Sequence, residues 1–458
     1  MEINFKENSL IQLASSVNNK ELSAVMLVQK SLDVIEELNP AINAFCAVNP
    51  ESSMVQAEKV DALIKQGSEL PLAGIPIGVK DLEDAKGFTT TFGSNLHLND
   101  NPATNDSILV SRLKKLGAVV VGKTNTPEFG YKGITDNIPF GATKNPWNEK
   151  YSPGGSSGGS AAAIASGMVP LATGSDGGGS IRIPAALCGL SGIKLSQGRI
   201  PNGGIKPPGS GLLTVKGPMT KTIHDTAYVL DECMGPDPTD IFSLQKPSVR
   251  WLPQLDCKLP EQVVWSSTMG FNTLDDEVAE WCEVILEKLK DAGVKIIREE
   301  EIWTENPIFH WIVFWTSARA KAQGHLRGTE KWDQIDQNLR KQIEMGMDKF
   351  TALDYAKAVD QCHTLNFRLN EIFKKAPLIL TPVIRGLTPK LYAEGTVNGA
   401  ETTDWVGFTP PINMTRNPAG TVPAGTSKDK LPMGVQIIGP QMADLEVLKA
   451  IAALENIF

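Results

Sequence analysis

A segment of small residues between positions 152 and 192 contains the side chains best suited to covalent chemistry. Glycine, serine and alanine dominate it, but apolar stretches are embedded in it, so we interpret it as ordered structure rather than a linker. Three glycines, Gly177, Gly178 and Gly179, come directly before Ser180. A turn without side chains can direct several backbone N–H groups at one point, as an oxyanion hole requires. The pattern indicates acyl transfer at a serine, with a purely structural glycine turn as the alternative.

A nucleophile elbow is one way to use these serines. Gly154–Gly158 matches the pattern G-x-S-x-G around Ser156, and the next register centres on Ser157. An elbow needs a strand before the serine and a helix after it, whereas Pro153 precedes this one, and proline is unfavourable inside a strand. None of the five histidines stands in a context that suggests a catalytic triad. A Ser-His-Asp esterase therefore remains a remote alternative.

A second pattern, at residues 117–124, matches the phosphate-binding loop G-x-x-x-x-G-K-[ST]. A phosphate loop follows a strand and opens a helix, so that free N–H groups surround the phosphates. Here the middle residues are themselves typical of a strand, and Pro127 interrupts any helix that follows. We therefore expect a strand and no nucleotide site. No zinc, calcium or dinucleotide motif is visible in the sequence, so we expect neither a metal nor a cofactor.

Several segments occur together in an order that is far more specific than any one of them. The central segments are GVKD at 78–81, PGGSSGGSA at 153–161 and GSDGGGSIRIP at 174–184. Supporting segments are GKTNTPE at 122–128, GLSGIK at 189–194, GPMT at 217–220 and LPMGVQIIG at 431–439. This ordered set resembles the amidase signature family over most of the chain, except roughly residues 240–375.

The resemblance implies a set of site residues. Carried over by position, the catalytic residues of the family fall on Lys80, Ser156 and Ser180. Ser180 would be the nucleophile, Ser156 would relay its proton beside a cis peptide bond, and Lys80 would be the final base. The oxyanion hole would consist of the N–H groups of Gly177, Gly178, Gly179 and Ser180.

The chemistry of the residue types is compatible with these roles. A serine hydroxyl is a poor nucleophile until a neighbouring base takes its proton. A neutral lysine can be that base, but its reference pKa of about 10.4 must fall by roughly 3, which burial can achieve. Lys80 follows an apolar strand at 74–79, and Asp81 should point to the opposite face of that strand. The alternative is that Lys80 is a buried lysine in an ion pair.

Other residues of these segments are expected to support the site. The resemblance makes Asp176 and Arg182 a bracing ion pair around the glycine turn, with a surface salt bridge as the alternative. We expect Ser157 to form hydrogen bonds within its own loop without a catalytic role. Asn125 and Glu128 belong to a matched segment, and a buried polar brace explains them at least as well as a catalytic role.

Hydrophobic periodicity predicts an α/β fold. Residues 22–38 have the pattern of an amphipathic helix, and residues 107–116 read as a helix that is followed by a strand at 118–121. Residues 376–386 and 418–438 resemble strands and turns again.

We expect one amidase signature domain over residues 1–458, with a mostly β-sheet centre covered by helices. Residues 1–240 and 376–458 would form its core, and a variable, helical and aromatic-rich section would occupy about 240–375.

Composition restricts the other classes of function. The chain has 458 residues, of which 41% are hydrophobic and 21% charged, as in a globular protein. Its net charge of −8 argues against nucleic acid as a partner. No apolar run reaches the length of about 18 residues that indicates a membrane span, and no signal peptide is visible. The six cysteines are scattered without a C-x-x-C pair, so we expect free thiols and a cytoplasmic location.

The expected activity is hydrolysis of a C–N bond in a small-molecule amide, with carbamates and aryl amides as candidate substrates and a monomer or homodimer as the active form. The alternative is the A subunit of a glutamyl-tRNA amidotransferase, a glutaminase that passes ammonia to partner subunits. Aromatic residues between 303 and 332 would line the substrate site or pack in the core. The glycine- and proline-rich loop at 196–211 is a candidate lip over the site.

Overall fold

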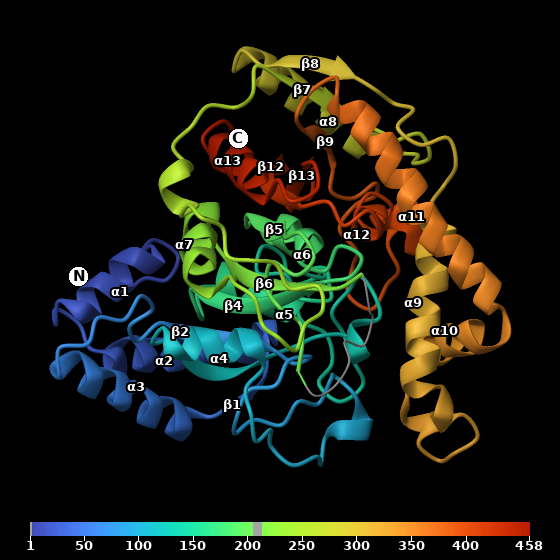
Figure 1. Ribbon diagram of the computed structural model, residues 1–458. Helices are drawn as coiled ribbons and strands as arrows, with labels where there is room; N and C mark the ends of the chain where they lie inside the picture. The colour runs from blue at the N-terminus through green and yellow to red at the C-terminus, as the bar shows by residue number, and fades with distance from the viewer. Residues whose placement is uncertain (1, 205–212) are drawn as a thin grey trace.

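The computed structural model describes residues 2–204 and 213–458, and Figure 1 shows its elements in chain order. Residues 205–211 of the candidate lip lie outside the described residues. Two sheets with helices around them form the centre of the molecule, so the predicted α/β class is confirmed.

The first sheet contains five strands. In spatial order they are β1 (Phe45–Val48), β3 (Val119–Thr124), β2 (Pro76–Lys80), β4 (Leu171–Asp176) and β6 (Val215–Thr220). The central strand β2 runs parallel to both β3 and β4, whereas β1 and β6 are antiparallel to their neighbours. Because parallel strands end at the same edge, Lys80 at the end of β2 lies beside the segment that leads from β4 into the glycine turn.

Burial explains why these strands were visible in the sequence. Every residue of β2 and β3 is buried, as expected for parallel strands that are covered on both faces. The helix before β3, α4 (Ile108–Lys115), ends ahead of Gly117, whose φ of +101° favours glycine. Residues 117–124 therefore form a turn and a strand, as predicted, and not a phosphate loop.

The second sheet contains six strands. In spatial order they are β5 (Gly192–Lys194), β12 (Ala419–Thr426), β13 (Pro432–Ile438), β9 (Ile379–Pro382), β7 (Gln262–Trp265) and β8 (Lys295–Arg298). A separate two-stranded hairpin is formed by β10 (Thr396–Val397) and β11 (Ala400–Glu401). Strands β7 and β8 belong to the section from about 240 to 375, which is mainly helical as expected but also extends this sheet. The division into a core and a variable section remains a prediction.

Helices cover both sheets (Figure 1). In the N-terminal half they are α1 (Leu10–Asn18), α2 (Ala24–Ile42), α3 (Pro50–Lys65), α4, α5 (Gly158–Ala165), α6 (Arg182–Leu187) and α7 (Ile223–Cys233). In the C-terminal half they are α8 (Asp276–Asp291), α9 (Ile308–Gln323), α10 (Gln337–Asp348), α11 (Ala352–Phe373), α12 (Pro410–Met414) and α13 (Asp444–Glu455). None of the helices in the described ranges is both long and apolar enough to cross a bilayer.

Helices α9, α10 and α11 pack together at one side of the molecule, where Figure 1 shows them in orange tones at the right. The contact between α9 and α10 is very close at Gly346, because a Cβ there would lie 2.2 Å from the carbonyl oxygen of Thr316. Helix α9 also contacts α12, which lies next to the glycine turn. This packing fixes α9 relative to the rest of the site.

Candidate active site

Lys80 stands at the end of β2 with its side chain buried among three serine hydroxyls. Its Nζ lies 2.8 Å from Ser156 Oγ, 2.8 Å from Ser157 Oγ and 3.0 Å from Ser175 Oγ. A hydroxyl can donate or accept, and a neutral amine has two N–H donors and one lone pair. The amine can therefore take a proton from one serine while it donates hydrogen bonds to the other two.

The surroundings of Lys80 favour the neutral amine. Burial lowers the pKa of Lys80 to about 7, although the carboxylates of Asp176 and Glu83 oppose this effect. Asp81 points to the other side of the strand, as predicted, and its carboxylate pairs with Lys123 Nζ at 3.1 Å. Within the described residues Lys80 has no ion-pair partner, which disfavours the alternative of a merely structural lysine.

Ser156 and Ser157 lie on a loop that enters α5, with no strand before them, and the peptide bond between Gly155 and Ser156 is cis. This arrangement does not fit a nucleophile elbow. The Ser157 hydroxyl binds Lys80 Nζ at 2.8 Å and the carbonyl oxygen of Ser175 at 3.3 Å, so the expectation that it bonds within its own loop was wrong. The N–H of Ser157 donates to the carbonyl oxygen of Ser180 at 3.2 Å, which joins this loop to the glycine turn. No histidine in the described residues forms a hydrogen bond with the hydroxyl of Ser156 or Ser180.

The expected relay needs two hydrogen bonds, one between Lys80 and Ser156 and one between Ser156 and Ser180. The described residues contain the first of them. Lys80 and Ser156 are in direct contact. The half-buried Ser180 follows the glycine turn, and its hydroxyl forms no hydrogen bond in the described part of the chain. The role of Ser180 therefore remains a prediction.

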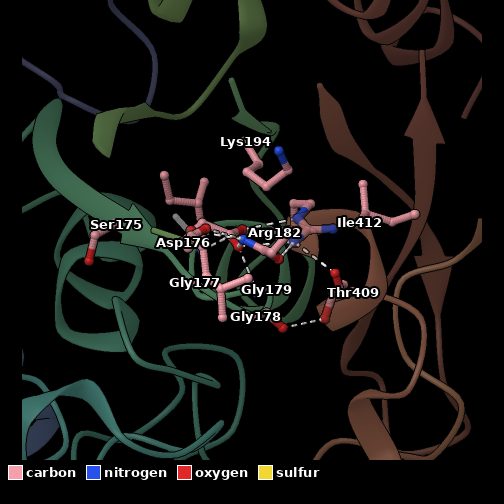
Figure 2. Close-up of polar contacts among 12 residues, drawn as sticks. Ser175, Asp176, Gly177, Gly178, Gly179, Arg182, Lys194, Thr409 and Ile412 are labelled. Atoms are coloured by element: carbon pink, nitrogen blue, oxygen red, sulfur yellow. Dashed lines mark hydrogen bonds and ion pairs between the residues drawn. The ribbon is translucent and has the colours of Figure 1, made fainter. Parts of the chain in front are cut away.

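The glycine turn connects β4 to α6 and is held through its carbonyl groups (Figure 2). Trp311 Nε1 donates to the carbonyl oxygen of Gly177 at 2.9 Å, and Thr409 Oγ1 donates to that of Gly178 at 2.7 Å. Gly179 has a φ of +124°, and a Cβ there would lie 2.2 Å from Thr409 Oγ1. Only glycine fits this position, both for its backbone conformation and for its space.

One of the expected oxyanion donors is engaged within the turn. The N–H of Gly179 donates to Asp176 Oδ1 at 2.7 Å, so it is directed at the carboxylate rather than at a substrate. In the described residues no acceptor is within hydrogen-bond reach of the N–H groups of Gly177, Gly178 or Ser180. These three N–H groups are the remaining candidates for an oxyanion hole.

Asp176 and Arg182 form a fully buried ion pair rather than a surface salt bridge. Arg182 donates to the carboxylate through Nε at 3.0 Å and through Nη2 at 2.9 Å. Burial by itself would raise the pKa of Asp176, but the Arg182 charge and its hydrogen bonds hold this pKa well below its usual range. Figure 2 shows Arg182 between the glycine turn and Thr409, which directly precedes α12. The pair therefore braces the turn.

Removal of Arg182 should destabilise the fold strongly. Arg182→Met leaves the Asp176 carboxylate buried without its countercharge, which is expected to lower the free energy of unfolding by about 3–5 kcal/mol. Denaturant titration measures the change. Lys428→Met is the control, because Lys428 pairs with Glu280 at 3.0 Å in an exposed position and should contribute little. Equal effects of the two substitutions would contradict a bracing role for Arg182.

Comparison with known proteins shows the family of the chain. The family described as Amidase matches residues 26–448 of the chain. The chain belongs to the amidase signature family. An acylamidase of Rhodococcus erythropolis is 34% identical over 98% of this chain and 95% of that protein. The A subunit of the glutamyl-tRNA(Gln) amidotransferase of Thiobacillus denitrificans is 33% identical over 96% and 95%, respectively.

A solved structure extends the likeness to the whole fold. The crystal structure of a bacterial aryl acylamidase of the amidase signature family has a TM-score of 0.91 and 27% sequence identity, and the match covers 98% of this chain and 96% of that one. Membership shows that the chain is an amidase-family hydrolase that acts on C–N bonds.

Two of the supporting residues expected in this amidase are structural. Asn125 Nδ2 donates to Thr143 Oγ1 at 3.1 Å, and its Oδ1 accepts a hydrogen bond from Asn137 at 2.6 Å, so it braces a loop. Glu128 Oε2 accepts a hydrogen bond from the backbone N–H of Asp336 at 2.7 Å, and Asp336 directly precedes α10. Neither side chain forms a hydrogen bond with Lys80, Ser156 or Ser180.

Four residues around the amidase site were not predicted. Ser175 binds Lys80, and Thr409 binds the glycine turn. Asn413 Oδ1 and Gln436 Oε1 each accept a hydrogen bond from Arg182 at 2.6 Å. Gln436 had a signal in the sequence, because it is polar within the apolar strand β13. The sequence around Asn413 contains no comparable signal.

The aromatic residues of the variable section are divided between the core and the site. Trp303 and Phe314 are buried in a hydrophobic cluster. Trp311 and Trp315 lie against the glycine turn, since a Cβ on Gly177 would lie 2.9 Å from the Trp315 ring. Trp311 is half-buried. Trp303 and Phe314 therefore follow the core interpretation, whereas a substrate wall formed by this section stays a prediction.

Proposed function

We propose that this amidase hydrolyses small-molecule amides through an acyl-enzyme on Ser180. The observation that carries the proposal is a buried amine, with its pKa lowered to about 7, placed 2.8 Å from the hydroxyl of Ser156. Ser180 Oγ attacks the substrate carbonyl carbon while its proton passes to Ser156 Oγ, and the proton of Ser156 passes to Lys80 Nζ. The N–H groups of Gly177, Gly178 and Ser180 stabilise the oxyanion.

The same groups complete the reaction. The tetrahedral intermediate collapses when the C–N bond breaks, and the proton on Lys80 returns through Ser156 to the leaving nitrogen. Water then attacks the acyl-enzyme and gives its proton to Lys80 by the same route. The acid departs when Ser180 Oγ recovers a proton, which restores the starting state. The structure describes no group of three or more His, Cys, Asp or Glu side chains arranged to hold a metal ion in residues 2–204 and 213–458.

Aryl amides are the substrates that we place first, with carbamates next. The half-buried Trp311 ring beside Gly178 supports an aromatic substrate, because aromatic rings favour stacked or edge contacts with one another. The similar proteins described as acylamidase and aryl acylamidase also support this class. A panel of p-nitroacetanilide, acetamide, a phenyl carbamate and glutamine tests the proposal. Faster turnover of acetamide than of the anilide would overturn the aryl preference.

The second candidate is the glutaminase activity of an amidotransferase A subunit. Its support is the 33% identity to the corresponding protein of Thiobacillus denitrificans. Glutamine turnover that appears only with partner proteins, with no hydrolysis of anilides, would favour it. The monomer or homodimer that we propose would instead be active alone, and size-exclusion mass measured with the active fraction tests this point. All six cysteines are free thiols, which supports the cytoplasmic location that we propose.

The rate should depend on pH through Lys80. The relay needs the neutral amine, and the pKa of Lys80 is lowered to about 7. We therefore expect kcat/KM for p-nitroacetanilide to rise as the pH increases through about 7 and then to level off. A lysine with its ordinary pKa would extend the rise to about pH 10. Steady-state rates across this range decide between the two profiles, and a profile that falls above pH 7 would contradict the base role.

A further inference from the structure

One face of α9 presents three hydrogen-bond donors at i, i+4 spacing, namely Trp311, Trp315 and Arg319. Each of them donates to a backbone carbonyl outside the helix. Trp311 Nε1 binds the carbonyl oxygen of Gly177 at 2.9 Å, Trp315 Nε1 binds that of Tyr131 at 3.2 Å, and Arg319 Nη1 binds that of Phe129 at 2.9 Å. Helix α9 therefore forms hydrogen bonds with two separate loops, the glycine turn and the turn at 129–131.

The three side chains also support one another. The rings of Trp311 and Trp315 stack at 5.0 Å with 18° between their planes. The Arg319 guanidinium lies over the Trp315 ring, 4.5 Å from its centroid. Trp315 and Arg319 are buried, and Trp311 is half-buried. Movement of one member of the stack requires movement of its neighbour.

Both loops that α9 binds belong to the candidate active site. A peptide unit is planar and trans, so the carbonyl of Gly177 and the N–H of Gly178 point in opposite directions. The bond from Trp311 therefore sets the direction of the Gly178 N–H, which is a candidate oxyanion donor. The second loop contains the carbonyls of Phe129 and Tyr131, which Arg319 and Trp315 bind. Gly130 stands between these two residues, and a Cβ there would lie 3.1 Å from Ser156 Oγ.

We propose that Trp311 and Trp315 are positioning residues of this amidase. Trp311 orients the oxyanion donor at Gly178. Trp315, together with Arg319, holds the turn at 129–131 that packs against the relay serine. The variable section would thereby control the geometry of the catalytic centre in addition to contacting the substrate. This inference rests on the proposed function.

Three Trp→Phe substitutions form a matched test. Trp311→Phe and Trp315→Phe remove the N–H donors of the stack but keep an aromatic ring. Trp303→Phe is the control, because Trp303 Nε1 donates to the carbonyl oxygen of Leu365 at 3.2 Å in the core, with no contact to the site. For each variant, kcat and KM are measured with p-nitroacetanilide as the substrate. The affinity for a trifluoromethyl ketone, which mimics the tetrahedral intermediate, and the melting temperature are measured as well.

Trp311→Phe should lower kcat by roughly 10- to 100-fold, since misplacement of a catalytic group costs factors of this order. KM should stay nearly unchanged, and the affinity for the ketone should fall in parallel with kcat. Trp315→Phe should lower kcat by about 10-fold, and the control should retain the rate of the original protein. An unchanged kcat in Trp311→Phe, or a rise in KM alone, would overturn the inference. If the protein hydrolysed no amide even before substitution, the proposed function itself would be wrong.

Discussion

Ser180→Ala is expected to abolish amide hydrolysis, with kcat reduced by about 10⁶-fold, as is typical when a serine nucleophile is lost. The substitution removes the only atom that forms the acyl bond in the proposed reaction. It should leave the fold intact, because the hydroxyl of Ser180 forms no hydrogen bond within the described residues. Initial rates with p-nitroacetanilide measure the loss. Mass spectrometry after treatment with a fluorophosphonate should show a covalent adduct in the original protein and none in the variant.

Ser166→Ala is the matched control for this prediction. Ser166 lies at the end of α5, in the same glycine- and serine-rich segment, and its hydroxyl donates to the carbonyl oxygen of Ala162 at 2.7 Å. This variant should keep its activity and its adduct. If Ser180→Ala still reacted with the fluorophosphonate, another residue would be the nucleophile, and the proposed mechanism would be wrong.

Lys80→Met should lower kcat by roughly 10⁴-fold, at the upper end of the usual contribution of a general base. Methionine has a similar length and tolerates an apolar environment, but it cannot accept a proton. The variant should also lose the rise of kcat/KM near pH 7, because the titrating amine is gone. Rates at several pH values, together with circular dichroism as a check on the fold, measure both effects.

Lys194 provides a matched control for Lys80. It is also fully buried, burial lowers its pKa to about 7, and among the described residues its Nζ donates only to the carbonyl oxygen of Leu195. The pH profile alone would not distinguish the two lysines. Lys194→Met should keep both the activity and the rise near pH 7. Loss of that rise in Lys194→Met but not in Lys80→Met would refute the assignment of the base.

Local sequence patterns predicted the elements that depend on local burial. Strands β2 and β3 were visible because they are continuous apolar runs covered on both faces. The direction of Asp81 followed from strand alternation alone. The short strands β7 and β8 were missed because runs of about four residues inside a helical section have no distinct period.

The site was predictable where residues lie close in sequence or match an ordered motif. The contact between Lys80 and Ser156 was expected, and the structure contains it. The engagement of the Gly179 N–H by Asp176 was missed, because the direction of a peptide group in a turn is not encoded by glycine itself. The contacts of Arg182 with Asn413 and Gln436 were also missed, because they join residues that are brought together only by the second sheet.

The long-range contacts of Arg182 have a consequence for biosynthesis. Its guanidinium binds Asn413 and Gln436, which are translated long after Arg182 itself. While a chain that ends before these residues is still attached to the ribosome, the arginine lacks two of its acceptors. The catalytic loop is then incompletely anchored. We therefore expect the enzyme to acquire its activity only when synthesis is nearly complete.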